Sequence, residues 1–259
     1  MLSYDAEGIG LFRTEFLFMD RTAMPTEEEQ FEAYRKVAVA MDEKPVIIRT
    51  LDIGGDKEIP YMGLKKDENP FLGYRAIRFC LDRKDDIYRP QLRALLRASA
   101  FGAIKIMIPM VTCVEEYREA KALIQEIMEE LDEKGIAYNH NIQVGIMVET
   151  AAASLMADVF AKEVDFFSIG TNDLSQLTLG MDRQNRRLDK FYDPRHPALL
   201  KMIRIIANNV HLEGKHISIC GDLAADLELT EYFIQIGIDE LSVAPNQVLS
   251  LRKKIREIQ

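Results

Sequence analysis

The chain has 259 residues, enough for one large α/β domain or two small ones, and its 47% hydrophobic and 29% charged residues are ordinary for a globular protein. The formal net charge of −9 argues against general nucleic-acid binding, although a local basic cleft could still hold a small anion. No apolar stretch reaches the length of a membrane span. The three cysteines have no C-x-x-C spacing, a pattern typical of a reduced, cytoplasmic protein, and no Cys/His cluster has the spacing of a zinc site.

Short apolar runs, rich in β-branched residues, alternate with amphipathic segments along the chain. The apolar runs predict strands near 8–12, 46–51, 104–110, 143–148, 165–170, 216–220 and 239–244. The amphipathic segments predict helices near 27–41, 86–99, 114–134, 151–162, 197–213 and 226–236. This alternation indicates an α/β fold with a parallel sheet covered on both faces. The leading prediction is a (β/α)8 TIM barrel, and an open doubly wound sheet is the alternative.

Two features depart from a regular barrel. The sequence predicts seven strands, whereas a closed barrel of this type needs eight. The segment 52–85 is rich in glycine and proline and predicts a long excursion after the second strand, and such long loops are usually functional. The sequence shows no internal repeat or linker, so residues 1–259 are predicted to form a single domain.

Chemically capable side chains follow successive predicted strands, at the end of a parallel barrel where reacting groups lie. They are Arg13, Glu15, Arg49, Asp52, Lys57, Arg75, Glu149, Asn172, Asp173, Arg183, Cys220 and Asp222. Several converging arginines suggest a compact polyanion, because a guanidinium binds phosphate or carboxylate through paired N–H groups. Glu149 and Asp173 supply the hard oxygen ligands that suit Mg²⁺. Cys220, beside a glycine at a strand end, could donate or accept a proton.

Each of these residues also has a simpler interpretation. An arginine taken singly is most often a surface residue, and Glu149 or Asp173 could cap the helix that follows it. Cys220 could be an inert buried thiol, the interpretation that fits Cys80 and Cys113 better. The four histidines have no catalytic spacing. The shared position of the candidates at one end of successive strands favours a site.

At these residues the sequence resembles a known family. The motifs that carry the likeness are, in chain order, GIGLFRTEFLFMDR, RTLDIGGDK, NPFLGYRAIR, GIMVET, FFSIGTNDLSQ, MDRQN and CGDLAAD. They resemble the C-terminal domain of the Enzyme I family, the phosphoenolpyruvate-protein phosphotransferases of the bacterial sugar phosphotransferase system. The likeness covers essentially the whole chain. Pyruvate phosphate dikinase and phosphoenolpyruvate synthase share the barrel and a GTNDLTQ-like motif, but the FLFMDR, IGGDK and MDRQN contexts look more like Enzyme I.

The resemblance implies a cytoplasmic, dimeric barrel that binds phosphoenolpyruvate with Mg²⁺. The residues implied to hold the phosphate and carboxylate are Arg13, Arg49, Arg75 and Arg183, assisted by Lys57 and Asn172. Glu149 and Asp173 would ligate Mg²⁺. Cys220 would protonate the methylene carbon of the enolate, which releases pyruvate. The phosphoryl group would pass to a histidine and then to the small carrier protein HPr.

The chain also departs from the family pattern. In Enzyme I the acceptor histidine and the HPr-binding part lie in separate N-terminal domains, so this chain is expected to be the substrate-binding half. The family's first strand precedes GIGLF, which would account for seven strands. The family pattern CGELAGD reads CGDLAAD here, with Asp222 one methylene shorter and Ala225 in place of glycine, and Ala151 stands where proline is usual. The alternatives are a dikinase- or synthase-like domain and a non-catalytic phosphoenolpyruvate-sensing or dimerisation module.

Overall fold

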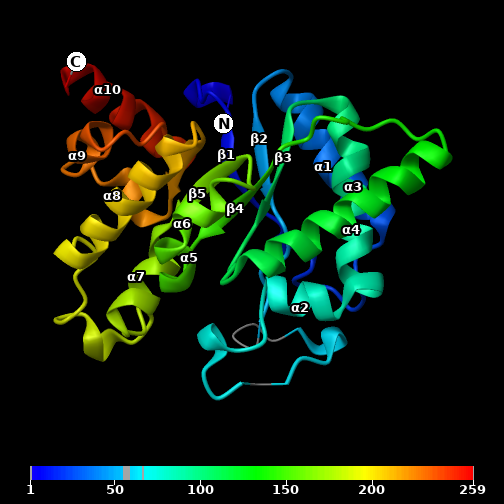
Figure 1. Ribbon diagram of the computed structural model, residues 1–259, viewed down its shortest axis with the longest axis horizontal. Coiled ribbons are helices and arrows are strands. Elements are labelled where there is room, and N and C mark those ends of the chain that lie inside the picture. The colour runs from blue at the N-terminus through cyan, green and yellow to red at the C-terminus, as the bar shows by residue number, and fades with distance from the viewer. Residues whose placement is uncertain (1, 55–58, 66, 259) are drawn as a thin grey trace. The chain divides into compact units, whose positions relative to one another are not determined.

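The computed structural model describes residues 2–54, 59–65 and 67–258. Within them, seven strands alternate with helices along the chain (Figure 1). The chain divides into two compact units, which are described separately: the N-terminal unit, Leu11–Met110 and Glu115–Val144, and the C-terminal unit, Met1–Gly10, Val111–Val114 and Gly145–Gln259. None of the described helices is long and apolar enough to cross a membrane.

The N-terminal unit places two parallel strands among helices. Its elements are β2 (Val46–Arg49), β3 (Ile104–Ile108), α1 (Glu27–Met41), α2 (Ile77–Asp82), α3 (Arg89–Ala98) and α4 (Val114–Glu133). The first two residues of strand β1 (Ile9–Arg13) belong to the C-terminal unit, and the other three belong to the N-terminal unit. Strands β2 and β3 pair in parallel, from Val46 opposite Ile104 to Arg49 opposite Met107. Helix α1 packs against α3, as Figure 1 shows.

Helix α1 has the boundaries that the sequence predicts, because its ends carry local signals. The Thr26 hydroxyl accepts a hydrogen bond from the Glu29 amide at 3.2 Å, and the Glu29 carboxylate accepts one from the Thr26 amide at 2.7 Å. This capping box satisfies two of the otherwise unpaired amides at the helix start. The helix ends at Asp42, whose φ of 57° cannot continue a right-handed helix.

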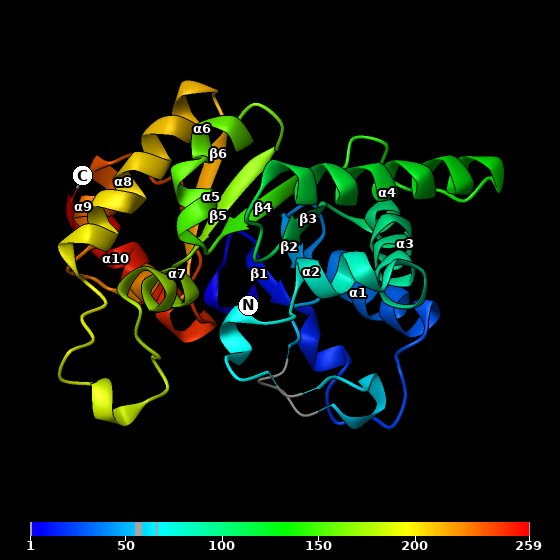
Figure 2. The ribbon, with the colours of Figure 1, turned by 60° about the horizontal axis from the view of Figure 1, so that its bottom comes forward.

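The C-terminal unit contains four consecutive parallel strands and the helices between them. Its elements are β4 (Val144–Val148), β5 (Phe166–Gly170), β6 (His216–Cys220), β7 (Glu240–Leu241), α5 (Ala151–Leu155), α6 (Ala157–Phe160), α7 (Thr171–Leu179), α8 (Pro197–Leu212), α9 (Thr230–Gln235) and α10 (Val248–Ile258). Strands β5 and β6 lie side by side with α8 against β6 (Figure 2). In their register Gly170 lies opposite Cys220, so the chain segments that follow both strands emerge at one level.

The remaining differences from the predicted elements have local causes. The predicted helix 151–162 is interrupted at Met156, whose φ of −98° and ψ of 16° separate α5 from α6. The predicted strand 239–244 is reduced to β7, because Pro245 closes the segment and has no amide to donate. The sequence did not predict α2, α7 or α10, and α2 lies inside the predicted excursion.

Candidate functional site

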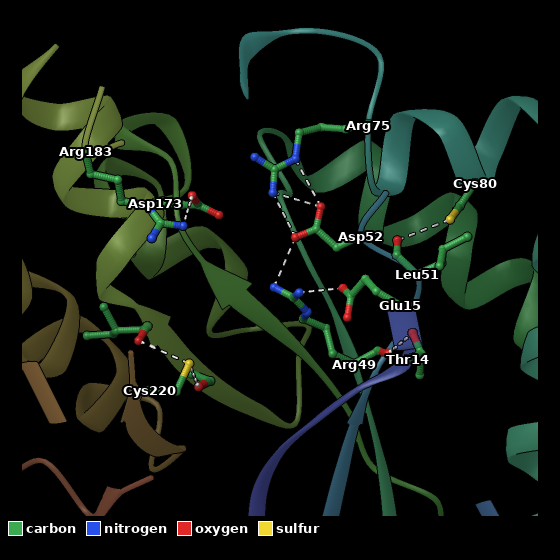
Figure 3. Close-up of polar contacts among 12 residues, drawn as sticks. Thr14, Glu15, Arg49, Leu51, Asp52, Arg75, Cys80, Asp173, Arg183 and Cys220 are labelled. Atoms are coloured by element: carbon green, nitrogen blue, oxygen red, sulfur yellow. Dashed lines mark hydrogen bonds and ion pairs between the residues drawn. The ribbon is translucent and has the colours of Figure 1, made fainter. Parts of the chain in front are cut away.

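The N-terminal unit contains four buried charged residues in mutual contact, which we call the arginine cluster: Glu15, Arg49, Asp52 and Arg75 (Figure 3). Arg75 donates from Nε and Nη2 to Asp52 Oδ1 at 3.0 and 2.8 Å, and from Nη2 to Oδ2 at 2.8 Å. Arg49 lies 3.1 Å from the same Oδ2 through Nη1, and its Nη2 donates to Glu15 Oε1 at 2.5 Å. Because each arginine is held by a carboxylate, both guanidinium groups are positioned before any ligand binds.

The end of β2, which positions the arginine cluster, is fixed by neutral side chains. The Thr14 hydroxyl donates to the carbonyl oxygen of Arg49 at 2.9 Å, and the Leu51 amide donates to Gln91 Oε1 at 2.9 Å. The guanidinium carbon of Arg75 lies 5.8 Å from the centroid of the Phe71 ring. The sequence analysis did not identify these supporting residues.

Three other residues of this unit bear on the predicted site. Arg13 has an exposed side chain, and its guanidinium carbon lies 5.1 Å from the centroid of the Phe16 ring. Lys57, predicted to contact the substrate, lies outside the described residues. Cys80 is buried beside Leu51, and burial, together with the negative charges of Asp52 and Glu15, raises the pKa of its thiol. A thiol held neutral in this way agrees with the inert role that we expected for Cys80.

In the C-terminal unit, the ends of β4 and β5 bring together the carboxylates of Glu149 and Asp173, which we call the carboxylate pair. One oxygen of Glu149 and one of Asp173 lie within 4.8 Å of each other, and the two residues are only 2% and 8% exposed. A Cβ built on Gly170 would lie 2.6 Å from Glu149 Cγ and 2.9 Å from its Oε1. The absent side chain at Gly170 therefore provides the space that the Glu149 carboxylate occupies.

Neither carboxylate serves as a helix cap, the alternative raised by the sequence. Thr150 caps α5, because its hydroxyl oxygen accepts from the Ala153 amide at 3.1 Å while the hydroxyl donates to the Val111 carbonyl at 3.0 Å. Helix α7 begins after Gly170 without a side-chain cap, and Asp173 lies in its first turn. At that position the helix dipole favours a negative charge.

Hydrogen bonds connect the end of β5 to the end of β6. Asn172 Oδ1 accepts from the Asp222 amide at 2.9 Å, and the Thr171 hydroxyl donates to the carbonyl oxygen of Cys220 at 3.0 Å. Gly221 has a φ of +95°, and a Cβ there would lie 2.6 Å from the Thr171 hydroxyl oxygen. A glycine is therefore required for this close approach, and Asn172 is held with one side-chain atom already engaged.

Arg183 and Cys220 complete the predicted residues of this unit. Helix α7 is followed by Gly180 in the left-handed conformation, and Arg183 lies three residues further along the chain. The Nη2 atom of Arg183 lies 3.7 Å from Asp173 Oδ1. The Cys220 thiol is buried and donates to the Ile169 carbonyl oxygen at 3.6 Å. Its Sγ also accepts a hydrogen bond from the Ser168 hydroxyl at 3.4 Å.

The histidines, all four in the described part of the chain, have positions that agree with structural roles. His196 Nδ1 accepts from the Ala198 amide at the start of α8, and His211 lies 3.3 Å from a carboxylate oxygen of Asp239. His140 stacks against Tyr138, and His216 is exposed at the start of β6.

These elements define a class: an α/β chain of parallel strands with charged side chains at the strand ends. Solved structures share the fold. A citrate lyase from Burkholderia xenovorans LB400 matches with a TM-score of 0.58 at 18% identity, covering 88% of this chain and 63% of that one. A Haloferax volcanii malate synthase matches with a TM-score of 0.56 at 13% identity, and the match covers 88% of this chain and 59% of that one. At these identities the likeness concerns the fold alone, and it confirms the predicted TIM-barrel class with one strand fewer than eight.

The sequence comparisons are more specific. The family described as "PEP-utilising enzyme, PEP-binding domain" matches residues 1–259, and the chain belongs to it. A phosphoenolpyruvate-protein phosphotransferase of Priestia megaterium is 49% identical over 258 residues, covering 100% of this chain and 45% of that protein. The protein of the same name from Staphylococcus carnosus (strain TM300) is 52% identical over 253 residues, and the match covers 98% of this chain and 44% of that protein. The resemblance to Enzyme I is thereby confirmed, and the chain spans under half the length of these relatives.

Proposed function

We propose that this chain is the phosphoenolpyruvate-binding catalytic domain of a phosphoenolpyruvate-protein phosphotransferase. The observation that carries the proposal is the arginine cluster within a chain that matches the family over its whole length. In the proposed reaction, the bond between phosphorus and the enol oxygen breaks and a bond to a histidine nitrogen forms. The enolate that remains takes up a proton and leaves as pyruvate.

The proposed anion-binding residues are those that the family motifs name. They are Arg13, Arg49, Lys57, Arg75, Asn172 and Arg183. Arg49 and Arg75 are held by carboxylates at low exposure, where charge-assisted hydrogen bonds to a phosphate are stronger than in water. Since little covalent chemistry on the phosphoryl group is left to the protein, positioning and charge neutralisation provide most of the catalysis.

The carboxylate pair suits a divalent cation. Glu149 and Asp173 provide hard oxygen donors close enough to share one ion, and Gly170 leaves room for the first of them. When bound, Mg²⁺ would neutralise charge on the phosphate and polarise the enol oxygen.

Cys220 is the proposed proton donor. Its S–H bond would break as a C–H bond forms at the methylene carbon, and the enolate oxygen would become the carbonyl oxygen of pyruvate. The thiol is buried at the end of β6, in a position that excludes bulk water from the transferred proton.

The acceptor histidine is proposed to belong to an N-terminal domain that lies outside this chain. From that histidine the phosphoryl group would pass to HPr. We further propose a single phosphoenolpyruvate-binding domain of residues 1–259 that forms a homodimer in the cytoplasm, as the family resemblance implies.

The proposed reaction is tested by supplying the chain with the separately produced N-terminal half of a phosphoenolpyruvate-protein phosphotransferase. Pyruvate formation from phosphoenolpyruvate and Mg²⁺ is then followed by a coupled lactate dehydrogenase assay. Pyruvate is expected only when both parts are present. A folded chain that binds phosphoenolpyruvate yet forms no pyruvate with any such partner would contradict a catalytic role.

A further inference from the structure

Strand β5 contains a buried hydroxyl that the proposed mechanism does not use. Ser168 is fully buried, and its neighbours on the strand are Phe167 and Ile169. A buried hydroxyl costs free energy unless it is hydrogen-bonded, and a β-branched apolar residue would suit a buried strand better. The only hydrogen bond that the described contacts give to this hydroxyl is the one to Cys220 Sγ, at 3.4 Å.

The register of β5 and β6 determines this contact. Ser168 lies opposite Ser218, and Gly170 lies opposite Cys220. Because every second residue of a strand faces the same way, these four positions share one face of the strand pair. The Cys220 sulfur accepts a hydrogen bond from Ser168 and donates its own proton to the Ile169 carbonyl at 3.6 Å. Both contacts come from β5, so this strand positions the Cys220 sulfur.

We infer that Ser168 is a positioning residue for proton delivery by Cys220. The inference rests on the proposed function, in which Cys220 protonates the enolate. When the S–H bond breaks and the proton joins the methylene carbon, the electron pair of the S–H bond stays on sulfur as a thiolate. The Ser168 hydroxyl already donates to that sulfur, so its hydrogen bond becomes charge-assisted in a buried environment at the moment the charge develops. An interaction that strengthens in the transition state lowers the barrier.

The neighbouring strand offers a matched control. Ser218 is also fully buried and lies opposite Ser168, but its hydroxyl donates to the Phe167 carbonyl at 3.3 Å, away from sulfur. A change of Ser218 to alanine removes a buried strand hydroxyl with a similar structural cost. A merely structural role of Ser168 would therefore give the two alanine variants the same effects.

The first measurement is pyruvate formation by the chain supplied with the N-terminal half, together with calorimetric binding of phosphoenolpyruvate. Ser168→Ala is expected to lower the pyruvate-forming rate about 100-fold, the lower end of the range for loss of one donor to a developing anion. The affinity for phosphoenolpyruvate should stay within a few-fold of wild type. Ser168→Thr, which keeps the hydroxyl, should recover most of the rate, and Ser218→Ala should retain it. An unchanged rate in Ser168→Ala, or an equal loss in Ser218→Ala, would overturn the inference.

The second measurement does not depend on the reaction. The infrared S–H stretching band of Cys220, assigned by its loss in Cys220→Ala, reports the hydrogen bonds at sulfur. Ser168→Ala should shift this band and Ser218→Ala should not. A band that is unchanged in Ser168→Ala would refute the contact itself. If Ser168→Ala shifts the band but the wild-type chain forms no pyruvate, the contact stands, whereas the proposed function and the role in proton delivery are overturned.

Discussion

The replacement of Gly170 by alanine tests how the carboxylate pair is built. The new Cβ would lie 2.6 Å from Glu149 Cγ, 2.9 Å from its Oε1 and 3.1 Å from Met147 Cγ. Gly170 has a φ of −82° and a ψ of 82°, so alanine brings no left-handed strain and the cost is steric. Overpacking of this kind typically costs about 1–3 kcal/mol. We expect a free energy of unfolding lowered by that amount, and weakened cation binding because the Glu149 carboxylate must move.

Urea denaturation measures the first effect, and titration with Mn²⁺ followed by electron paramagnetic resonance measures the second. Gly180→Ala is the matched control, because Gly180 closes the other end of α7 with a φ of +63° and has no atom within 4 Å of its built Cβ. That variant should lose about 1 kcal/mol through backbone strain alone and bind the cation normally. Unchanged stability and unchanged cation binding in Gly170→Ala would refute the packing of Glu149 on Gly170.

Three further variants address the other parts of the site. Asp52→Ala leaves the buried side chains of Arg49 and Arg75 without their shared carboxylate. The free energy of unfolding, measured by urea denaturation, should therefore fall by about 3–5 kcal/mol. A loss below about 1 kcal/mol would contradict a cooperative cluster. Asn172→Asp keeps the acceptor for the Asp222 amide but removes the side-chain N–H donors. The melting temperature should change little, while calorimetry should show about tenfold weaker phosphoenolpyruvate binding. Equal affinity would exclude Asn172 from the anion site. Cys220→Ala should bind phosphoenolpyruvate normally and form no pyruvate with the N-terminal half, and undiminished turnover would remove Cys220 as the proton donor.

The parts of the structure that could be predicted from sequence depend on local signals. The periodicity and the capping residues near Thr26 define α1, and short apolar runs define most of β2 to β6. Because parallel strands end at one edge, the positions of Arg49 and Glu149 just at or after strands also identified them as site candidates. These inferences need only the order of residues along one element.

The parts that could not be predicted depend on contacts between distant segments. Gln91 reaches the Leu51 amide from α3, and Arg75 reaches Asp52 across 23 residues, so neither pairing leaves a periodic signal. The hydrogen bond from Ser168 to Cys220 requires the register of two strands that are 52 residues apart in sequence. Residue types pointed to the chemistry of the site, but the partners that hold its side chains emerge only from the fold.

The central claim is that this chain binds phosphoenolpyruvate together with a divalent cation. Isothermal titration calorimetry of the folded chain with phosphoenolpyruvate, in the presence and absence of Mg²⁺, tests it most directly. We predict saturable binding that Mg²⁺ strengthens, and loss of that strengthening in Asp173→Asn, which removes one charge of the carboxylate pair. Absence of phosphoenolpyruvate binding by folded protein, with and without Mg²⁺, would contradict the proposed function.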